Sequence, residues 1–324
     1  MLMSVILFAI GLVLLIKGGD WFVDGATGIA KRFNLPDIVV GATVVSIGTT
    51  LPEVMVSTTG ALQGSGAMAY GNAIGSIICN TSLIAAISIV CNPGPVNTKS
   101  MKTPAIFFFA SAALYCLASY VLGEFPRWMG FVMLGIFVVY TILTVRNGLQ
   151  NPDEAEEEED EGGKPRTLIQ ELLLLVVGAA VIAVGADLLV EHGQVIAIGL
   201  GVPETVVALL FVALGTSLPE LVTTITSLRK GRASLGVGNV IGANVFNLVL
   251  VSGVAVSLAP FPVPAENTLL NTGLNLSLVL DIPVMLGVMI LMILPAMLKK
   301  KLGRWQGIAL LGIYVAFCVC QFML

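Results

Sequence analysis

Charge and histidine are scarce in this chain, and each shortage excludes a class of protein. Charged residues make up 11% of its 324 residues, whereas soluble domains carry about 25%. His192 is the only histidine, and the five cysteines lack the spacing of metal ligands. A zinc or copper site built from imidazole and thiolate groups is therefore not expected.

Motifs for catalysis and nucleotide binding are missing as well. His192 is remote in sequence from every serine in the polar motifs described below, so no nucleophile–base pair is available. The chain also lacks a Gly-rich nucleotide loop, which leaves no sign of energy input from ATP. We expect no enzyme activity, no cofactor, no nucleic-acid partner and no obligate protein partner.

Apolar residues, by contrast, make up 56% of the chain and gather in stretches long enough to cross a bilayer. The sequence thus predicts an all-α membrane protein with ten transmembrane helices and the lipid bilayer as its surroundings. The predicted spans are 2–30, 37–62, 68–90, 104–122, 127–146, 168–192, 204–228, 233–258, 278–297 and 304–323.

The basic residues predict how these helices are oriented. Fourteen of the sixteen Lys and Arg residues fall in loops that follow odd-numbered helices. Basic loops stay in the cytoplasm. We therefore expect a multi-pass protein of the cell membrane with both termini extracellular or periplasmic.

A shift of 167 residues aligns Gly11–Asn80 with Gly178–Asn247 without a gap. Five helices per copy is an odd number, so the two copies would insert with opposite topology, as in secondary transporters with a site at the midplane. The predicted units are a first inverted repeat at 1–149, an acidic cytoplasmic linker at 150–166 and a second inverted repeat at 167–324. The acidic run Asp153–Glu161 is typical of a solvated, disordered loop.

One carboxylate lies in the middle of an apolar segment in each copy. Glu53 ends the hexapeptide Gly48–Glu53 (GTTLPE), and Glu220 ends Gly215–Glu220 (GTSLPE). An ionisable group at membrane depth costs about 2.5–3.5 kcal/mol on insertion scales. We expect the two carboxylates to face each other across the repeat interface and to bind a small hard cation.

The proline before each glutamate predicts a break in the helix. Pro52 and Pro219 have no N–H to donate to the preceding turn, so main-chain oxygens there lose their helical partners. Such backbone persists at membrane depth only where it lines a cavity or is covered by protein. Free carbonyls, hydroxyls and carboxylates form the ligand set of Ca²⁺.

A second motif follows in each copy, Gly71–Asn80 (GNAIGSIICN) and Gly238–Asn247 (GNVIGANVFN). Ser76 and Asn80 are four residues apart and would share one helical face. We expect Asn80 and Asn247 to belong to the site; the alternative is an interhelical hydrogen bond. Asp20 and its counterpart Asp187 would either attract cations to an entrance or cap a helix.

These paired motifs resemble the two α-repeats of the cation/calcium exchanger superfamily, in particular the compact prokaryotic sodium/calcium exchangers. The resemblance implies ten helices, external termini, transported Na⁺ and Ca²⁺, and alternating access by sliding of the first and sixth helices. It implies that Ca²⁺ is bound by the carboxylates of Glu53 and Glu220 and by main-chain oxygens of Thr49 and Thr216. For Na⁺ it implies the same glutamates with Thr50, Ser76, Asn80, Thr216, Ser217 and Asn247.

The chain departs from the family pattern at two positions. Ala243 stands where Ser76 predicts a hydroxyl, so one Na⁺ site would be weaker or built differently. Asn247 stands where many relatives look to carry Asp, which leaves two formal negative charges and disfavours dependence on K⁺. A Ca²⁺/H⁺ antiporter on the same fold remains an alternative, and a cation channel is a more distant one.

Overall fold

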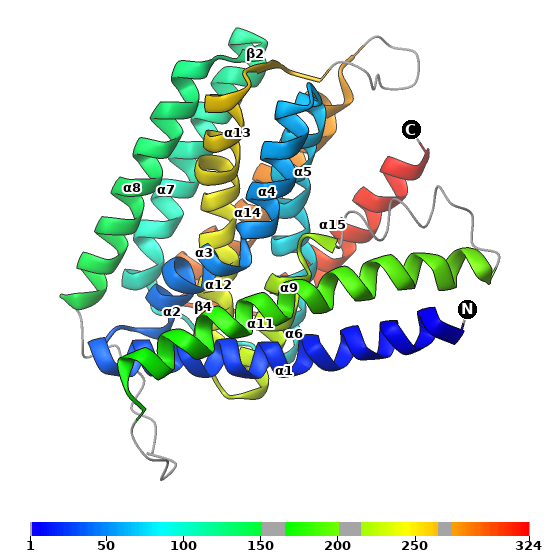
Figure 1. Cartoon of the computed structure of the whole chain (residues 1–324). Helices are drawn as coiled ribbons and strands as arrows, with labels where there is room; N and C mark the ends of the chain where they lie inside the picture. Colours follow the sequence, from blue (N-terminus) through cyan, green and yellow to red (C-terminus); the bar gives the residue numbers. More distant parts are fainter. Residues whose placement is uncertain (1, 151–165, 201–214, 265–273, 324) are drawn as a thin grey trace.

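The computed structural model describes residues 2–150, 166–200, 215–264 and 274–323, and almost all of these residues are helical (Figure 1). In these ranges eight helices are long and apolar enough to cross a membrane, and a bent helix pair makes a ninth span. The seventh predicted span, 204–228, begins in a segment outside the described residues. The prediction of a multi-pass helical membrane protein is confirmed.

The first half of the chain forms five spans, three of which are interrupted by a π-helical turn or by a bend. Their elements are α1 (Leu2–Phe33); α2 (Asp37–Val40), η1 (Gly41–Val45), α3 (Ser46–Thr49) and α4 (Leu51–Leu62); α5 (Gly66–Cys79), η2 (Asn80–Ala85) and α6 (Ala86–Cys91); α7 (Thr98–Cys116) and η3 (Leu117–Leu122); and α8 (Arg127–Leu149). Two short strands, β1 (Gly94–Pro95) and β2 (Glu124–Phe125), lie in the connections.

The second half repeats this organisation wherever it is described. Its elements are α9 (Leu168–Gly199); α11 (Leu218–Arg229); α12 (Ala233–Phe246), η5 (Asn247–Val251) and α13 (Ser252–Leu258); β3 (Phe261–Pro262); η6 (Ser277–Asp281) and α14 (Ile282–Lys299); β4 (Lys301–Leu302); and α15 (Arg304–Met323).

Burial divides the helices into a centre and a periphery. In the most apolar window of Ala233–Leu258, 83% of residues are buried inside the protein, and in that of Gly66–Cys91, 72% are. The corresponding share for α1 and for α9 is only 22%. The third and eighth predicted helices thus form the centre, while α1 and α9 lie outside it with large apolar side chains exposed to lipid.

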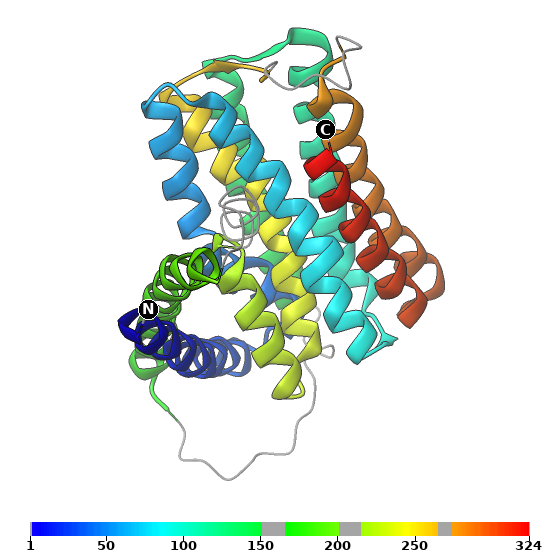
Figure 2. The same ribbon diagram turned by 90° about the vertical axis from the view of Figure 1, so that its right-hand side faces the viewer.

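Helices α1 and α9 run side by side across one end of the bundle (Figures 1 and 2). Their backbones touch at glycines. A Cβ atom on Gly11 would lie 2.9 Å from the carbonyl oxygen of Gly185, and one on Gly185 would lie 2.9 Å from that of Gly11. Further along, a Cβ on Gly178 would lie 2.9 Å from the carbonyl oxygen of Gly18. The two helices are therefore antiparallel and in close backbone contact at these glycines.

Two antiparallel strand pairs join the connecting loops at opposite ends of the molecule. Strand β1 pairs with β4, with Gly94 opposite Leu302, and β2 pairs with β3, with Phe125 opposite Phe261. The first pair joins the loops after the third and ninth predicted helices, and the second joins those after the fourth and eighth. Each pair connects loops that the ten-helix prediction assigns to the same side of the membrane.

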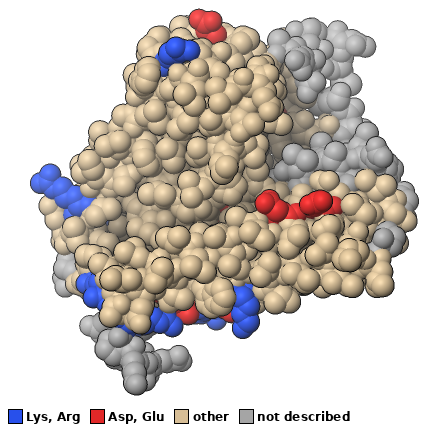
Figure 3. Space-filling view, viewed as in Figure 1, with Lys and Arg blue, Asp and Glu red and all other residues tan. Residues whose placement is uncertain are grey.

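The basic side chains also gather at one end. On the face shown in Figure 3, most Lys and Arg side chains lie along the lower and left margins, near the crossing of α1 and α9. This is the arrangement expected when basic loops share one membrane surface.

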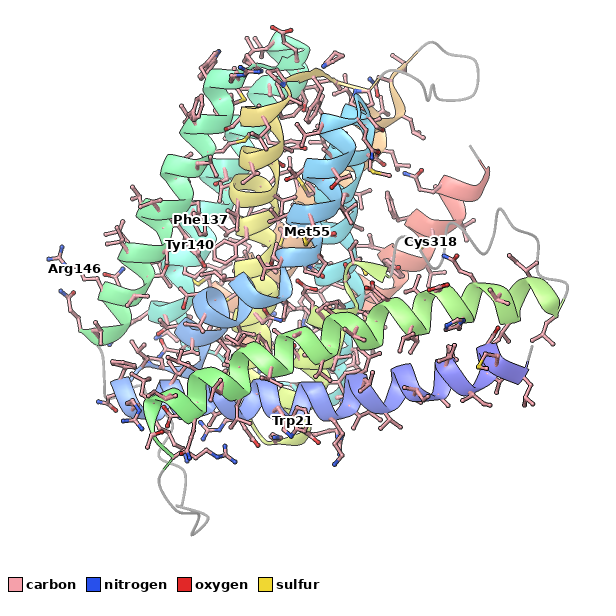
Figure 4. The ribbon with its side chains drawn as sticks, viewed as in Figure 1. Trp21, Met55, Phe137, Tyr140, Arg146 and Cys318 are labelled. Carbon is pink, nitrogen blue, oxygen red and sulfur yellow. The ribbon has the colours of Figure 1, made fainter. Side chains whose placement is uncertain are left out.

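Aromatic packing holds α8 against the bundle centre. Phe137 and Tyr140 lie together on α8 (Figure 4), and both rings pack on Phe246 of α12, with centroids 5.1 and 5.7 Å away. The Tyr140 hydroxyl donates a 2.8 Å hydrogen bond to the carbonyl oxygen of Ala42. Because Ala42 lies in the π-helical turn η1, this bond supplies a partner for irregular backbone beside the predicted site.

Candidate cation-binding site

The helix break predicted before each glutamate is present in both halves. Between α3 and α4 the helix axis bends by 45°. Thr50 lies at this break with φ −84° and ψ −4°, and Ser217 precedes α11 with φ −89° and ψ 2°. The two residues are 167 positions apart, so the same local sequence gives the same backbone. In each copy a proline occupies the first turn of the helix that follows, where its missing N–H costs that helix no bond but withholds one from the preceding turn.

Glu53 and Glu220 lie one turn beyond these breaks, and both side chains are completely buried. Neither carboxylate has a hydrogen-bond partner among the described residues. Helix α3, which ends at Thr49, contacts both glutamate helices, α4 and α11. Buried charges normally pair or bind metal ions, so this arrangement fits a cation.

Asn80 and Asn247 occupy equivalent positions in the two halves. Each is completely buried and begins a π-helical segment, η2 or η5, and neither amide group has a partner among the described residues. Single π-turns inside α-helices occur frequently at functional sites. Asn80 is the first residue of such a turn. The regular α-helical spacing predicted for Ser76 and Asn80 therefore holds only as far as this asparagine.

All nine predicted site residues lie on elements that pack against one another. Helix α4, which carries Glu53, contacts α5 and η5; helix α11, which carries Glu220, contacts α12, η2 and α3. Each glutamate helix therefore packs on the asparagine segment of the opposite half. The set comprises Thr49 at the end of α3, Thr50 at the first break, Glu53 on α4, Ser76 on α5, Asn80 in η2, Thr216 and Ser217 at the second break, Glu220 on α11 and Asn247 in η5.

The hydroxyl groups of this set differ in their partners. Thr50 Oγ1 and Ser217 Oγ are buried without a hydrogen-bond partner in the described part of the chain. The hydroxyls of Thr49 and Thr216, in contrast, donate to asparagines. The groups of these two residues that the resemblance assigns to Ca²⁺ are their main-chain oxygens.

Two asparagines outside the predicted set connect the halves. Thr216 Oγ1 donates to Oδ1 of Asn72 at 3.3 Å, and Thr49 Oγ1 donates to Oδ1 of Asn239 at 3.1 Å. These bonds are equivalent, because 167 residues separate both the threonines and the asparagines. The amide nitrogen of Asn72 also donates to the Glu53 carbonyl oxygen at 3.2 Å and to Ser57 Oγ at 2.8 Å. Sequence reasoning noted the matched pair but did not assign it to the site.

Asp20 contacts a loop of the other half through an ion pair, and its predicted entrance or capping role stays a prediction. Lys230 Nζ lies 3.9 Å from Asp20 Oδ1 and 2.6 Å from Asp24 Oδ1, and it donates to the Asp20 carbonyl oxygen at 2.9 Å. Asp20 is therefore a contact between α1 and the loop after α11. An entrance or capping role for Asp187 stays a prediction.

Comparison with known proteins decides the family. The family model for sodium/calcium exchanger protein matches residues 3–146 and 171–323. The chain belongs to the sodium/calcium exchanger family. The unmatched stretch between these two ranges contains the whole of the predicted acidic linker, 150–166, which lies largely outside the described residues.

Individual members of the sodium/calcium exchanger family match over almost the whole chain. The sodium/calcium exchanger MaX1 of Methanosarcina acetivorans is 29% identical over 98% of both chains. An uncharacterised membrane protein of Methanocaldococcus jannaschii is 33% identical over 95% of this chain and 94% of its own length. Among solved structures, the sodium–calcium exchanger NCX_Mj, soaked with Na⁺ and Sr²⁺, superimposes with a TM-score of 0.80 at 31% identity, covering 98% of both chains.

Proposed function

We propose that this protein is a secondary active antiporter that exchanges Na⁺ for Ca²⁺ by alternating access. The observation that carries the proposal is the pair of buried carboxylates of Glu53 and Glu220, each beside a helix break and without a hydrogen-bond partner among the described residues, in a chain of the sodium/calcium exchanger family. Structures of the relative NCX_Mj were obtained with Na⁺ and Sr²⁺ and with Na⁺ and Ca²⁺, which supports the same cations as substrates here.

The proposed architecture is ten transmembrane helices in two inverted repeats, 1–149 and 167–324, joined by the linker 150–166. Reciprocal contacts support the inversion: Gly11 meets Gly185 and Gly18 meets Gly178, and the 167-residue shift turns one pair into the other, because Gly11 corresponds to Gly178 and Gly18 to Gly185. With basic loops in the cytoplasm, both termini would lie outside.

The proposed Ca²⁺ ligands are the carboxylates of Glu53 and Glu220 with main-chain oxygens of Thr49 and Thr216. Ca²⁺ takes 6–8 oxygen ligands, and the breaks supply carbonyls that regular helices would use internally. Na⁺ would be held by the same carboxylates with the hydroxyl and amide groups of Thr50, Ser76, Asn80, Thr216, Ser217 and Asn247. No resident cofactor is part of this proposal.

Shared ligands explain how the two fluxes would be coupled. Ca²⁺ and Na⁺ compete for the same two carboxylates, so they cannot occupy the site together. One Ca²⁺ or two Na⁺ would neutralise the formal charge of the pair, whereas an empty site would expose two bare carboxylates to a low dielectric. Helices α1 and α9 would then slide across a neutral site only.

Vesicle transport tests this function. Purified protein in liposomes loaded with Na⁺ is diluted into Na⁺-free medium containing ⁴⁵Ca²⁺, with pH clamped on both sides. We expect Ca²⁺ uptake that disappears when the Na⁺ gradient is collapsed. Uptake that follows an imposed pH gradient and ignores Na⁺ would instead establish Ca²⁺/H⁺ antiport, and single-channel currents would establish a channel.

A further inference from the structure

We propose that Asn72 and Asn239 are positioning residues for Ca²⁺, each fixing the main chain of a helix break that carries candidate ligands. The inference rests on the proposed cation site, because its ligands are the oxygens whose places the asparagines would set. Neither amide is itself offered as a ligand.

The need for such residues follows from the breaks. Pro52 and Pro219 remove helical hydrogen bonds at the point where ligand oxygens must be held, and a binding site loses function when its ligands shift by more than about 0.5 Å. Helices α5 and α12, which carry the two asparagines, belong to the buried centre. A side-chain amide reaching from this centre to a break replaces the missing helical restraint.

Asn72 holds both breaks at once. Its Nδ2 group binds the Glu53 carbonyl oxygen, in the first half, and its Oδ1 atom accepts from Thr216, in the second. The distance between the two ligand-bearing segments is therefore set through one planar amide. Asn239 does the equivalent for Thr49, and its Oδ1 atom also accepts a 3.3 Å bond from Ser46 Oγ.

The side-chain amides of Asn72 and Asn239 differ in how many of their polar atoms are hydrogen-bonded. Every polar atom of the Asn72 side chain has a partner, whereas Asn239 Nδ2 is buried without one in the described part of the chain. Thr224, the counterpart of Ser57 at the 167-residue shift, likewise has an unpartnered buried hydroxyl. In this conformation Asn72 is consequently the stronger restraint, and its removal has the larger effect.

Calorimetric titration of the purified full-length protein with Ca²⁺ tests the inference. We expect the Kd for Ca²⁺ to rise about three- to tenfold in Asn72→Ala, the effect of losing one or two hydrogen bonds, and to rise less in Asn239→Ala. Because the spacing of the ligands changes, the ratio of the Sr²⁺ and Ca²⁺ constants is also expected to change.

Asn244 provides a matched control on α12. It is completely buried and donates to Thr81 Oγ1 at 2.7 Å, away from both breaks. Asn244→Ala is expected to lower thermal stability while leaving the Kd for Ca²⁺ unchanged. An equal rise in Kd in Asn72→Ala and Asn244→Ala, or an unchanged Kd in Asn72→Ala, would overturn the inference.

Ser57→Ala removes only the 2.8 Å bond to Asn72 and is the variant to use if Asn72→Ala does not fold. It is expected to raise the Kd for Ca²⁺ by a smaller factor than Asn72→Ala. An unchanged Kd would count against the inference.

Failure of the proposed antiport has a separate signature. Wild-type protein that binds Ca²⁺ but shows no Na⁺-driven uptake would refute antiport, while the Kd comparison still decides the role of the asparagines.

Discussion

Lys230 Nζ lies 2.6 Å from Asp24 Oδ1, which fastens α1 to the loop between α11 and α12. Beside this contact, a Cβ on Gly19 would lie 2.7 Å from Val222 Cγ1, so α1 is packed tightly on α11. The equivalents of Asp20, Asp24 and Lys230 at the 167-residue shift are Asp187, Glu191 and Gln63. Because Gln63 carries no charge, the other copy has no counterpart of this ion pair.

Alternating access requires two conformations that open to opposite sides of the membrane. Lys230→Gln is expected to shift the balance between them away from the conformation described here. A partly exposed ion pair contributes about 0.2–1 kcal/mol, which corresponds to a change of up to about fivefold in their ratio. The Ca²⁺ concentration for half-maximal exchange should change accordingly. Gln63→Lys should move it in the opposite direction, and a shift of the same sign in both variants would contradict the assignment.

Glu53→Gln and Glu220→Gln should each reduce Na⁺-driven ⁴⁵Ca²⁺ uptake to the level of empty liposomes. Each variant keeps the volume of the side chain but leaves one formal charge to face Ca²⁺, and the amide nitrogen turns a donor toward the cation. Glu124→Gln, at an exposed carboxylate in β2, is the control and should retain uptake. Wild-type uptake in either buried variant would refute the site.

Ser76→Ala should raise the Na⁺ concentration needed for half-maximal exchange, and Ala243→Ser should lower it. The two positions are 167 residues apart and both are buried, but only the first has a hydroxyl oxygen to offer to Na⁺. A change of about three- to tenfold is expected for one such contact. Equal Na⁺ dependence in all three proteins would show that neither position binds Na⁺.

Gly185→Ala should destabilise the contact between α1 and α9. The new methyl group would lie 2.9 Å from both the Gly11 carbonyl oxygen and the Leu15 nitrogen, and overpacking of this kind typically costs about 1–3 kcal/mol. The midpoint of thermal unfolding in detergent measures the effect. Gly135→Ala, with no described atom within 4 Å of its Cβ, should leave this midpoint unchanged, and a smaller loss for Gly185→Ala than for Gly135→Ala would refute the packing role.

Local signals in the sequence were sufficient to predict the described helices and the breaks before Glu53 and Glu220. Pro52 and Pro219 predicted where the helices bend because a missing N–H acts on its own turn, whatever the surroundings. The family was also predicted correctly, since two motifs recur at one offset. The individual ligand roles and the orientation of the termini stay predictions.

Contacts between distant segments were beyond the same reasoning. The bonds from Thr49 to Asn239 and from Thr216 to Asn72 depend on how two helices meet, and no periodicity within one helix encodes that. The only signal was that both asparagines recur at the 167-residue shift inside a motif that glycines alone could explain. Lys230 similarly gave no hint of its partners, because Asp20 and Asp24 are about 200 residues away.

The π-helical turns that begin at Asn80 and Asn247 have a consequence for how the molecule could deform. Such a turn is a common place for a helix to kink. One begins at each of these asparagines, at matching positions in both halves. Duplication of the ancestral segment would thus have copied a point of flexure together with the polar groups, giving both copies a similar ability to yield beside a passing ion.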